Sequence, residues 1–170
     1  LYNNMKNSIP FLFLLICFWQ CQPVNPPAEM KESAENEPEQ ISYDSTLAAE
    51  LGADEYGMAK YVMAFLKKGP NRDQDSTTAA NMQKAHLENI NRLVEEGKLS
   101  LAGPFLDDGE VRGIYIFNVE TVEEAEALTN SDPAIQAGRL VMELHPWYGS
   151  AALMKIPELH KKLESKNVAE

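Results

Sequence analysis

The sequence predicts one α+β domain between residues 56 and 150, with its elements in the order strand, helix, strand, strand, helix, strand. Three observations lead to this prediction. Residues 61–66 are apolar at every position, which is typical of a central strand buried on both faces. Residues 76–96 carry apolar side chains at helical spacing. The run Asp107-Asp108-Gly109 has the composition of a hairpin turn.

The first helix has clear start and stop signals. Ser76 or Asp75 can cap its amino end, and Gly97 should end it. At 100° per residue, one stripe of this helix contains Ala79, Met82, His86, Leu87, Ile90, Leu93 and Val94. His86 lies near the middle of that stripe, so we expect the helix to press this histidine toward the sheet.

The remaining elements complete the order. We expect strands at residues 99–105 and 112–119, a helix capped by Thr121, a short helical turn opened by Asp132-Pro133, and a last strand over 139–147. This is the ferredoxin-like β-α-β-β-α-β arrangement, with the helices on one sheet face. The other face also carries apolar residues and needs a cover. A second copy of the sheet would supply it, which predicts a homodimer built as a dimeric α+β barrel.

The first 21 residues are typical of an export signal. Lys6 precedes an apolar run over residues 9–19, which is short for a membrane span. The run stops at Cys21, where a polar stretch begins, as in a bacterial lipoprotein signal whose cysteine is acylated. Cys17 is the alternative acceptor, although apolar residues continue past it, and an uncleaved anchor is the alternative to processing. We expect an exported protein of the cell envelope, lipid-anchored to a bacterial membrane.

Composition divides the rest of the chain. Residues 22–55 are rich in proline and glutamate and poor in large apolar side chains, so we expect a disordered acidic tether. Residues 56–150 form the predicted domain, and residues 151–170 a helical tail with a Lys-rich helix over 157–165. The solvated His160 lies in that helix.

Charge and cysteine usage exclude several functions. The net charge of −11 repels phosphate backbones, so we expect no nucleic-acid partner. Both cysteines lie in the N-terminal apolar segment. The domain therefore has no cysteine nucleophile, thiolate zinc site or internal disulfide. With three histidines in the whole chain, we predict no metal site, and we expect no cofactor.

His86 and Asp132 are the candidate catalytic residues. A histidine on a buried stripe needs a hydrogen-bond partner, and a carboxylate would make it an oriented acid or base near neutral pH. The alternative is a core histidine bonded to a backbone carbonyl. Asp132 before Pro133 also fits a helix N-cap, which explains it without function. The spacing of the two residues does not bring them together.

A third cluster lies at the end of the last strand. Glu143 and His145 alternate to the face away from the helices, where they could line a cavity between two copies. The alternative is a plain strand end, with Trp147 and Tyr148 covering an edge.

An ordered set of short motifs resembles the YCII-related family. The set comprises Lys84-Ala85-His86-Leu87, Gly97-Lys98-Leu99, Ala102-Gly103-Pro104, Asp132-Pro133-Ala134 and Ala137-Gly138. The resemblance covers about 90 residues. It implies a dimeric ferredoxin-like barrel in which His86 and Asp132 match the family's acid–base pair. It also implies lyase or dehydrochlorinase-type chemistry on small cyclic molecules. The export signal and tether depart from the family's short cytosolic members.

These observations favour a cofactor-independent lyase or isomerase acting on a small molecule. His86 would be the acid or base, Asp132 would orient it, and Gly103 and Pro104 would form a pocket wall, with Glu143 and His145 in support. The main alternative is a non-catalytic ligand-binding or assembly module at the envelope. A haem- or flavin-assisted oxygenase of similar fold is a third, without a ligand signature in the sequence.

Overall fold

The computed structural model describes residues 42–169, so the predicted signal, with Cys17 and Cys21, and most of the predicted tether lie outside the described residues. The described elements are α1 (Ser45–Glu50), β1 (Met58–Lys68), α2 (Ser76–Glu95), β2 (Leu99–Pro104), β3 (Val111–Phe117), α3 (Val122–Thr129), α4 (Pro133–Gln136), β4 (Leu140–Ser150), η1 (Ala151–Lys155) and α5 (Ile156–Lys161). Within this range, no helix is both long and apolar enough to cross a membrane.

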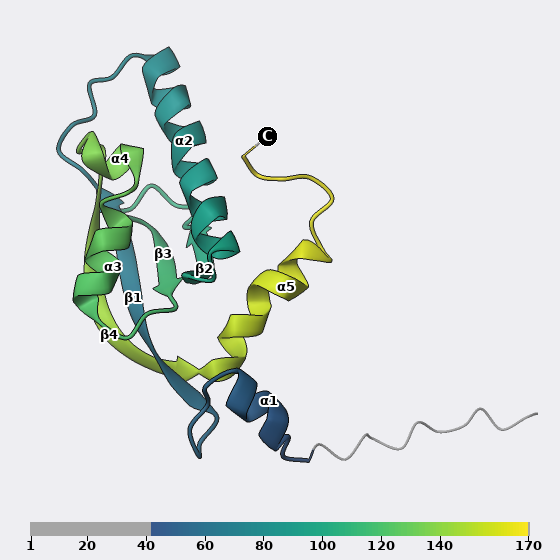
Figure 1. Ribbon diagram of the computed structural model, residues 1–170. Helices are drawn as coiled ribbons and strands as arrows, with labels where there is room; N and C mark the ends of the chain where they lie inside the picture. The colour runs from purple at the N-terminus through teal and green to yellow at the C-terminus, as the bar shows by residue number, and fades with distance from the viewer. Residues whose placement is uncertain (1–41, 170) are drawn as a thin grey trace, which may run out of the picture. The chain divides into compact units, whose positions relative to one another are not determined.

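The sheet has four antiparallel strands in the order β2-β3-β1-β4 (Figure 1). β1, the strand expected to be buried on both faces, lies in the interior of the sheet between β3 and β4. The helices α2 and α3 connect strands that are not neighbours, as the split β-α-β arrangement requires. The structure therefore confirms the predicted α+β class and the predicted order of the elements.

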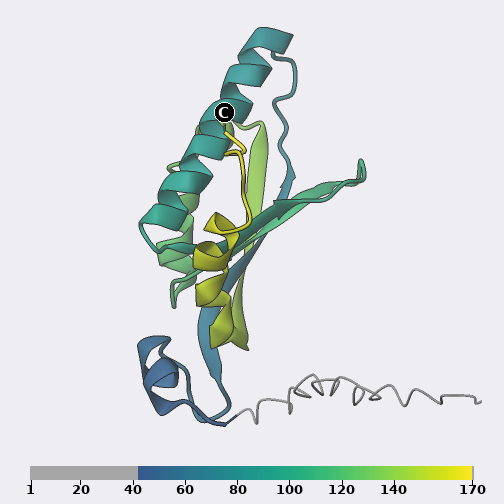
Figure 2. The same cartoon turned by 90° about the vertical axis from the view of Figure 1, so that its right-hand side faces the viewer.

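The main core lies between the helices and one face of the sheet. Views from two directions show α2 and α3 on that same side (Figures 1 and 2). Val62 of β1, Phe117 of β3, Leu93 of α2 and Ala125 of α3 are all buried in one cluster. Asp75 caps α2 by accepting hydrogen bonds from the next turn, and Gly97 follows its end with a φ of 68°. That left-handed conformation favours glycine, which explains why the helix stops there.

The second sheet face is covered by the chain itself at one end. Leu51 just after α1, the following turn and η1 pack there with Tyr61 and Ile116. Further along the same face, Phe65 and Ile114 are half-buried, and Val141 is 40% exposed. The cover that the sequence predicts for this face is thus partly supplied within one chain, and part of the face stays open.

The folded part begins earlier than the sequence predicted. Residues 42–55, assigned to the disordered tether, contain α1, which Asp44 caps by accepting from Thr46 and Leu47. The acidic composition of this segment predicted disorder, but a short helix forms there, and Leu51 after its end packs on the second sheet face. The tail also differs from expectation, because α5 ends at Lys161, four residues before the predicted end at Ser165.

Candidate functional site

A cavity of about 650 Å³ lies between α2 and the sheet. Its wall comes from most parts of the fold, including the C-terminal segment. The lining residues are Leu66, Arg72, Gln83, His86, Leu87, Ile90, Ala102, Gly103, Pro104, Arg112, Tyr115, Ala134, Arg139, Leu140, His160 and Val168. Cavities of this size hold small organic molecules.

The structure brings His86 and Asp132 together at the wall of this cavity. His86 Nδ1 lies 2.6 Å from Asp132 Oδ2, although the two residues are 46 positions apart in the chain. Both side chains are buried, with exposed fractions of 6% and 1%. A carboxylate accepts hydrogen bonds and does not donate them, so Nδ1 carries the proton. In the neutral ring, Nε2 is then left with its lone pair.

Asp132 is held by three hydrogen bonds. It is the N-cap of α4, where Oδ1 accepts from the backbone N–H of Ala134 at 2.8 Å. Oδ2 accepts from His86 and, at 3.4 Å, from Asn89 Nδ2 one turn further along α2. The cap geometry explains why aspartate precedes Pro133 here, and it fixes the second oxygen toward His86. The side chain is therefore both a cap and the partner of the histidine.

Tyr115 of β3 contacts the other nitrogen of the imidazole. Its hydroxyl lies 3.3 Å from His86 Nε2, and the two rings stack with centroids 6.3 Å apart. Burial, and then the negative charge of Asp132, raises the pKa of Tyr115 well above its ordinary value of 10.0. The hydroxyl therefore keeps its proton, and it can donate a hydrogen bond to Nε2 or to a bound molecule.

A further polar layer supports the pair. Asn89 Oδ1 accepts from Arg92 Nη2 at 2.8 Å and from Ser131 Oγ at 3.1 Å, so the amide that reaches Asp132 is itself held in place. Among the described residues, no buried side-chain nitrogen or oxygen lacks a hydrogen-bond partner. Such a fully bonded network keeps a buried polar group in one orientation.

The predicted supporting residues divide between the two sheet faces. Gly103 and Pro104 line the cavity with His86. Glu143 and His145 do not line it, because their side chains alternate to the opposite face, where they are exposed. Their place on this second face is the one that alternation predicted, and a role in a cavity between two copies stays a prediction. The two side chains hydrogen-bond each other at 2.9 Å, and Lys67 forms an ion pair with Glu143.

Several lining residues were not singled out from the sequence. Tyr115 is one of several apolar or aromatic positions in β3, and only the sheet register places it opposite α2. Arg72 and Arg139 come from two loops and Arg112 from one strand, without a shared motif. His160 was expected to be solvated, and it is exposed, but it also contributes to the cavity wall.

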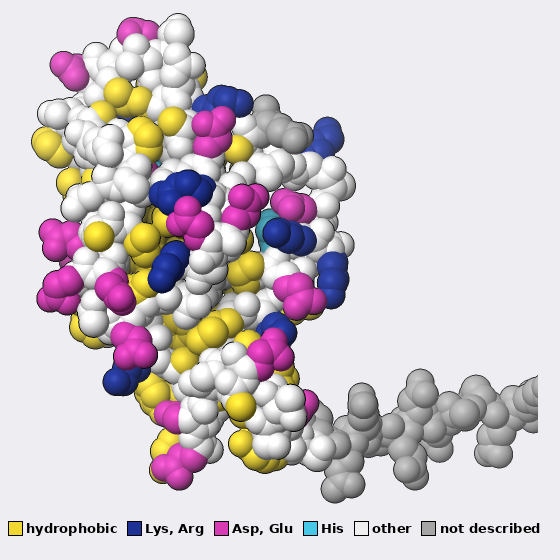
Figure 3. Space-filling model, in the orientation of Figure 1, with side chains coloured by type: hydrophobic (Ala, Val, Ile, Leu, Met, Phe, Trp, Pro, Cys, Tyr) yellow, Lys and Arg dark blue, Asp and Glu magenta, His cyan; other side chains and the backbone are white. Residues whose placement is uncertain are grey.

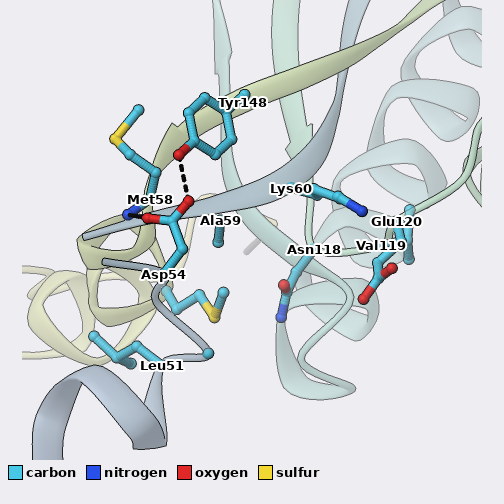
Figure 4. Close-up of a pocket in the computed structure, with 11 residues that line it drawn as sticks. Leu51, Asp54, Met58, Ala59, Lys60, Asn118, Val119, Glu120 and Tyr148 are labelled. Carbon is cyan, nitrogen blue, oxygen red and sulfur yellow. Dashed lines mark hydrogen bonds between the residues drawn. The ribbon is translucent and has the colours of Figure 1, made fainter. Parts of the chain in front are cut away.

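A second hollow of about 410 Å³ lies near the end of α1. Figure 4 shows Asp54 and Tyr148 pointing toward one another across its wall, where the tyrosine hydroxyl donates to Asp54 Oδ2. Asp54 also accepts from the backbone N–H of Tyr56 and Met58. These contacts fasten the turn after α1 to β4, so this hollow is explained by the packing of α1.

The described part of the chain contains no group of three or more histidine, cysteine, aspartate or glutamate side chains arranged to hold a metal ion. Surface charge is mixed, as Figure 3 shows for the face seen in Figure 1, where acidic and basic side chains alternate around apolar ones.

The fold and the cavity define a ferredoxin-like α+β domain with a buried His–Asp pair on the wall of a cavity large enough for a small molecule. The chain belongs to the YCII-related domain family, whose model matches residues 58–148. The uncharacterised protein YjpA of Bacillus subtilis (strain 168) is 31% identical over 62 residues, which cover 36% of this chain and 71% of that protein.

One solved structure is similar over part of the chain. It is 5-chloro-2-hydroxyhydroquinone dehydrochlorinase (TftG) from Burkholderia phenoliruptrix AC1100, in complex with 2,5-dihydroxybenzoquinone. The TM-score is 0.39 and the sequence identity 20%, over 51% of this chain and 92% of that one.

Proposed function

We propose that the domain is a small-molecule enzyme in which His86 moves a proton and Asp132 orients it. One observation carries the proposal: the imidazole that lines the cavity has its Nδ1 2.6 Å from a buried carboxylate. This contact reserves Nδ1 for Asp132 and leaves Nε2 to exchange a proton with a bound molecule. General acid–base catalysis needs such a fixed and singly available nitrogen.

The reaction class that fits these groups is a lyase or isomerase reaction without a cofactor. His86 would remove a proton from a carbon of the substrate. In an isomerase reaction it would return the proton to another carbon, and in a lyase reaction a leaving group on the neighbouring carbon would depart. Tyr115 keeps its proton and can donate to an oxygen on which negative charge develops. Its contact with Nε2 is long, at 3.3 Å, so a substrate can replace it at little cost.

Proton abstraction can be tested before the substrate is known. The full-length chain, kept in mild detergent, is incubated in D₂O with a panel of small cyclic ketones, unsaturated lactones and hydroquinones. Exchange of C–H for C–D is followed by NMR. We expect catalysed exchange on at least one compound, its loss in His86→Gln, and its retention in His145→Gln, which changes the histidine on the opposite face.

The rival function is a non-catalytic ligand-binding or assembly module. The double role of Asp132 as helix cap and partner of His86 favours it, because a purely structural His86–Asp132 pair would have the same geometry in the absence of a ligand. No exchange on any compound, together with a lower melting temperature as the main effect of His86→Ala, would favour this rival.

We also propose that the domain works as a homodimer tethered to the cell envelope. The half-buried apolar side chains of the open sheet face support the dimer. The apolar segment that ends at Cys21 supports the anchor. Replacing Cys21 by Ala should release the mature protein from membranes or leave it unprocessed. Wild-type protein found in the soluble fraction with Met5 intact would contradict anchoring.

A further inference from the structure

The cavity that contains His86 is basic in an acidic protein. The whole chain has 26 acidic and 15 basic residues besides its histidines. The lining residues of the cavity nevertheless include three arginines and two histidines, and no aspartate or glutamate. Asp132 is adjacent, but it does not line the cavity, and its carboxylate accepts three hydrogen bonds within the wall.

Two of the arginines lie in a corner where backbone hydrogen bonds join the loop after β1 to the residues just before β4. Arg72 Nη1 donates to the carbonyl of Arg139 at 3.3 Å, and Arg139 Nη1 donates to Gln74 Oε1 at 2.7 Å. The approach of the two segments requires glycine at position 69, because a Cβ there would overlap the backbone of Gly138. This corner joins the loop after β1 to the start of β4.

The charge of this corner is not neutralised by the described residues. Arg72 and Arg139 donate to neutral oxygens, and neither forms an ion pair within residues 42–169. A guanidinium group that bonds only neutral oxygens keeps its positive charge available to a bound anion. Guanidinium also matches the two oxygens of a carboxylate or phosphate group.

The third arginine reaches the cavity through an irregularity in the sheet. In the pairing of β1 with β3, Leu66 pairs with Gly113 and Lys67 with Val111, so Arg112 is an extra residue. Regular alternation would place Arg112 on the opposite face, with Ile114. The bulge instead lets its side chain line the cavity, as bulges near functional sites often do. Its ion pair with the exposed Asp108 is long, at 3.8 Å.

The rest of the wall is apolar. Leu66, Leu87, Ile90, Ala102, Leu140 and Val168 line the same space. A ligand that satisfies both parts of the wall has a hydrocarbon body and an anionic group.

We propose that the cavity selects a small organic acid, with its anionic group at Arg72, Arg112 and Arg139 and its apolar body against the aliphatic wall beside His86. This inference rests on the proposed function, for which it names the substrate class. The recognising chemistry is a planar or tetrahedral anion on a ring or short chain, either a carboxylate or a phosphate monoester.

Calorimetric titrations of the full-length chain in mild detergent test the proposal. The probes are benzoate, its neutral analogue benzamide, and phenyl phosphate, which separates the two anion types. A charge-assisted hydrogen bond is worth ~1.5–3 kcal/mol, or about tenfold or more in affinity. We expect at least one anion to bind about tenfold or more tightly than benzamide. Arg72→Gln and Arg139→Gln should each remove most of that preference. Lys98→Gln, an equal charge change at an exposed site, should not.

A conservative variant separates charge from folding. Arg139→Lys should keep more of the preference for the anion than Arg139→Gln does. Equal binding of anions and benzamide, no binding of either anion, or the same loss in Lys98→Gln would overturn the proposal. The proposed acid–base function is judged separately, because His86→Gln should keep anion binding and lose proton exchange. Proton exchange without a preference for the anions would overturn only the proposed substrate class. A preference for the anions, with proton exchange unaffected by His86→Gln, would overturn only the proposed catalytic role of His86.

Discussion

Two histidine–carboxylate pairs lie on opposite faces of the same sheet. His86 and Asp132 are 2.6 Å apart, with exposed fractions of 6% and 1%, whereas His145 and Glu143 are 2.9 Å apart, with exposed fractions of 48% and 47%. The distances are nearly the same, and the surroundings are not. Water and salt screen the outer pair, so its coupling is weak. The inner pair lies out of water, where an unpaired partner is costly.

The comparison shows that the pairing of residue types does not by itself define a site. The inner pair has a cavity on one side and a bonded network on the other, so its imidazole has one orientation, and its Nε2 contacts only the Tyr115 hydroxyl among the described side chains. The outer histidine keeps its contact with Glu143 but faces solvent and does not line the cavity.

The largest expected difference between the pairs is in stability. Asp132→Ala removes the cap of α4 and leaves the buried His86 without its partner. We expect it to destabilise the fold by about 2 to 5 kcal/mol. Glu143→Ala should change stability little, because its partners remain solvated. Urea unfolding of both variants measures the difference, and equal stability of the two variants would mean that burial does not distinguish the pairs.

The second prediction concerns whether the outer pair stays exposed. If the open face packs against a second copy, residues 42–170 should have twice the monomer mass by light scattering at micromolar concentration. Stable interfaces of this kind bury on the order of 1,600 Å² in total. Phe65, whose ring lies 5.6 Å from that of His145, should be central to this contact. Phe65→Asp should then give a monomer, and a wild-type monomer would contradict the dimer.

The sequence was sufficient for the elements because their signals are local. The apolar run of β1, the cap at Asp75, the left-handed Gly97 and the Asp132-Pro133 cap each depend on a few neighbouring residues. The short helix α1 was missed because the acidic, proline-rich composition of residues 22–55 predicted disorder, although Asp44 caps the helix and Leu51 after its end packs on the second sheet face.

The site was predictable only in part, because it depends on contacts between distant residues. His86 could be placed on a buried stripe, but Asp132 reaches it through the packing of α4 on α2. Tyr115 depends on strand register. Arg112 depends on a bulge, and a bulge reverses the face that simple alternation assigns. Alternation along β4 predicted that Glu143 and His145 face away from the helices, and the sheet register places them there. Their role in a cavity between two copies stays a prediction.

A third prediction tests the orientation of the inner imidazole. In Asp132→Asn, the cap requires the amide oxygen to accept from Ala134, which leaves the NH₂ group facing His86. Nδ1 must then accept, and the proton moves to Nε2. We expect nitrogen-15 NMR to show the Nδ1–H tautomer in the wild type and the Nε2–H tautomer in this variant. His145 should be unaffected. An unchanged His86 tautomer would mean that Asp132 does not set it.

The smallest expected effect is the titration of the outer pair. Hydrogen bonds from Lys67 and then from His145 lower the pKa of Glu143 below its ordinary value of 4.5. A lowered folded-state pKa contributes stability above the unfolded value, and this contribution is lost as the pH falls through the folded value. The contribution is small because the group is exposed.

Carbon-13 NMR of the Glu143 carboxyl should give a midpoint below 4.5. Lys67→Gln should move it back toward 4.5, because the first cause of the shift is removed. High salt should also move the Glu143 midpoint of the wild type back toward 4.5, because salt screens exposed charges. A midpoint that neither Lys67→Gln nor salt moves would show that Glu143 is not coupled to its neighbours. The contact between Glu143 and His145 would then contribute nothing measurable to the free energy of unfolding.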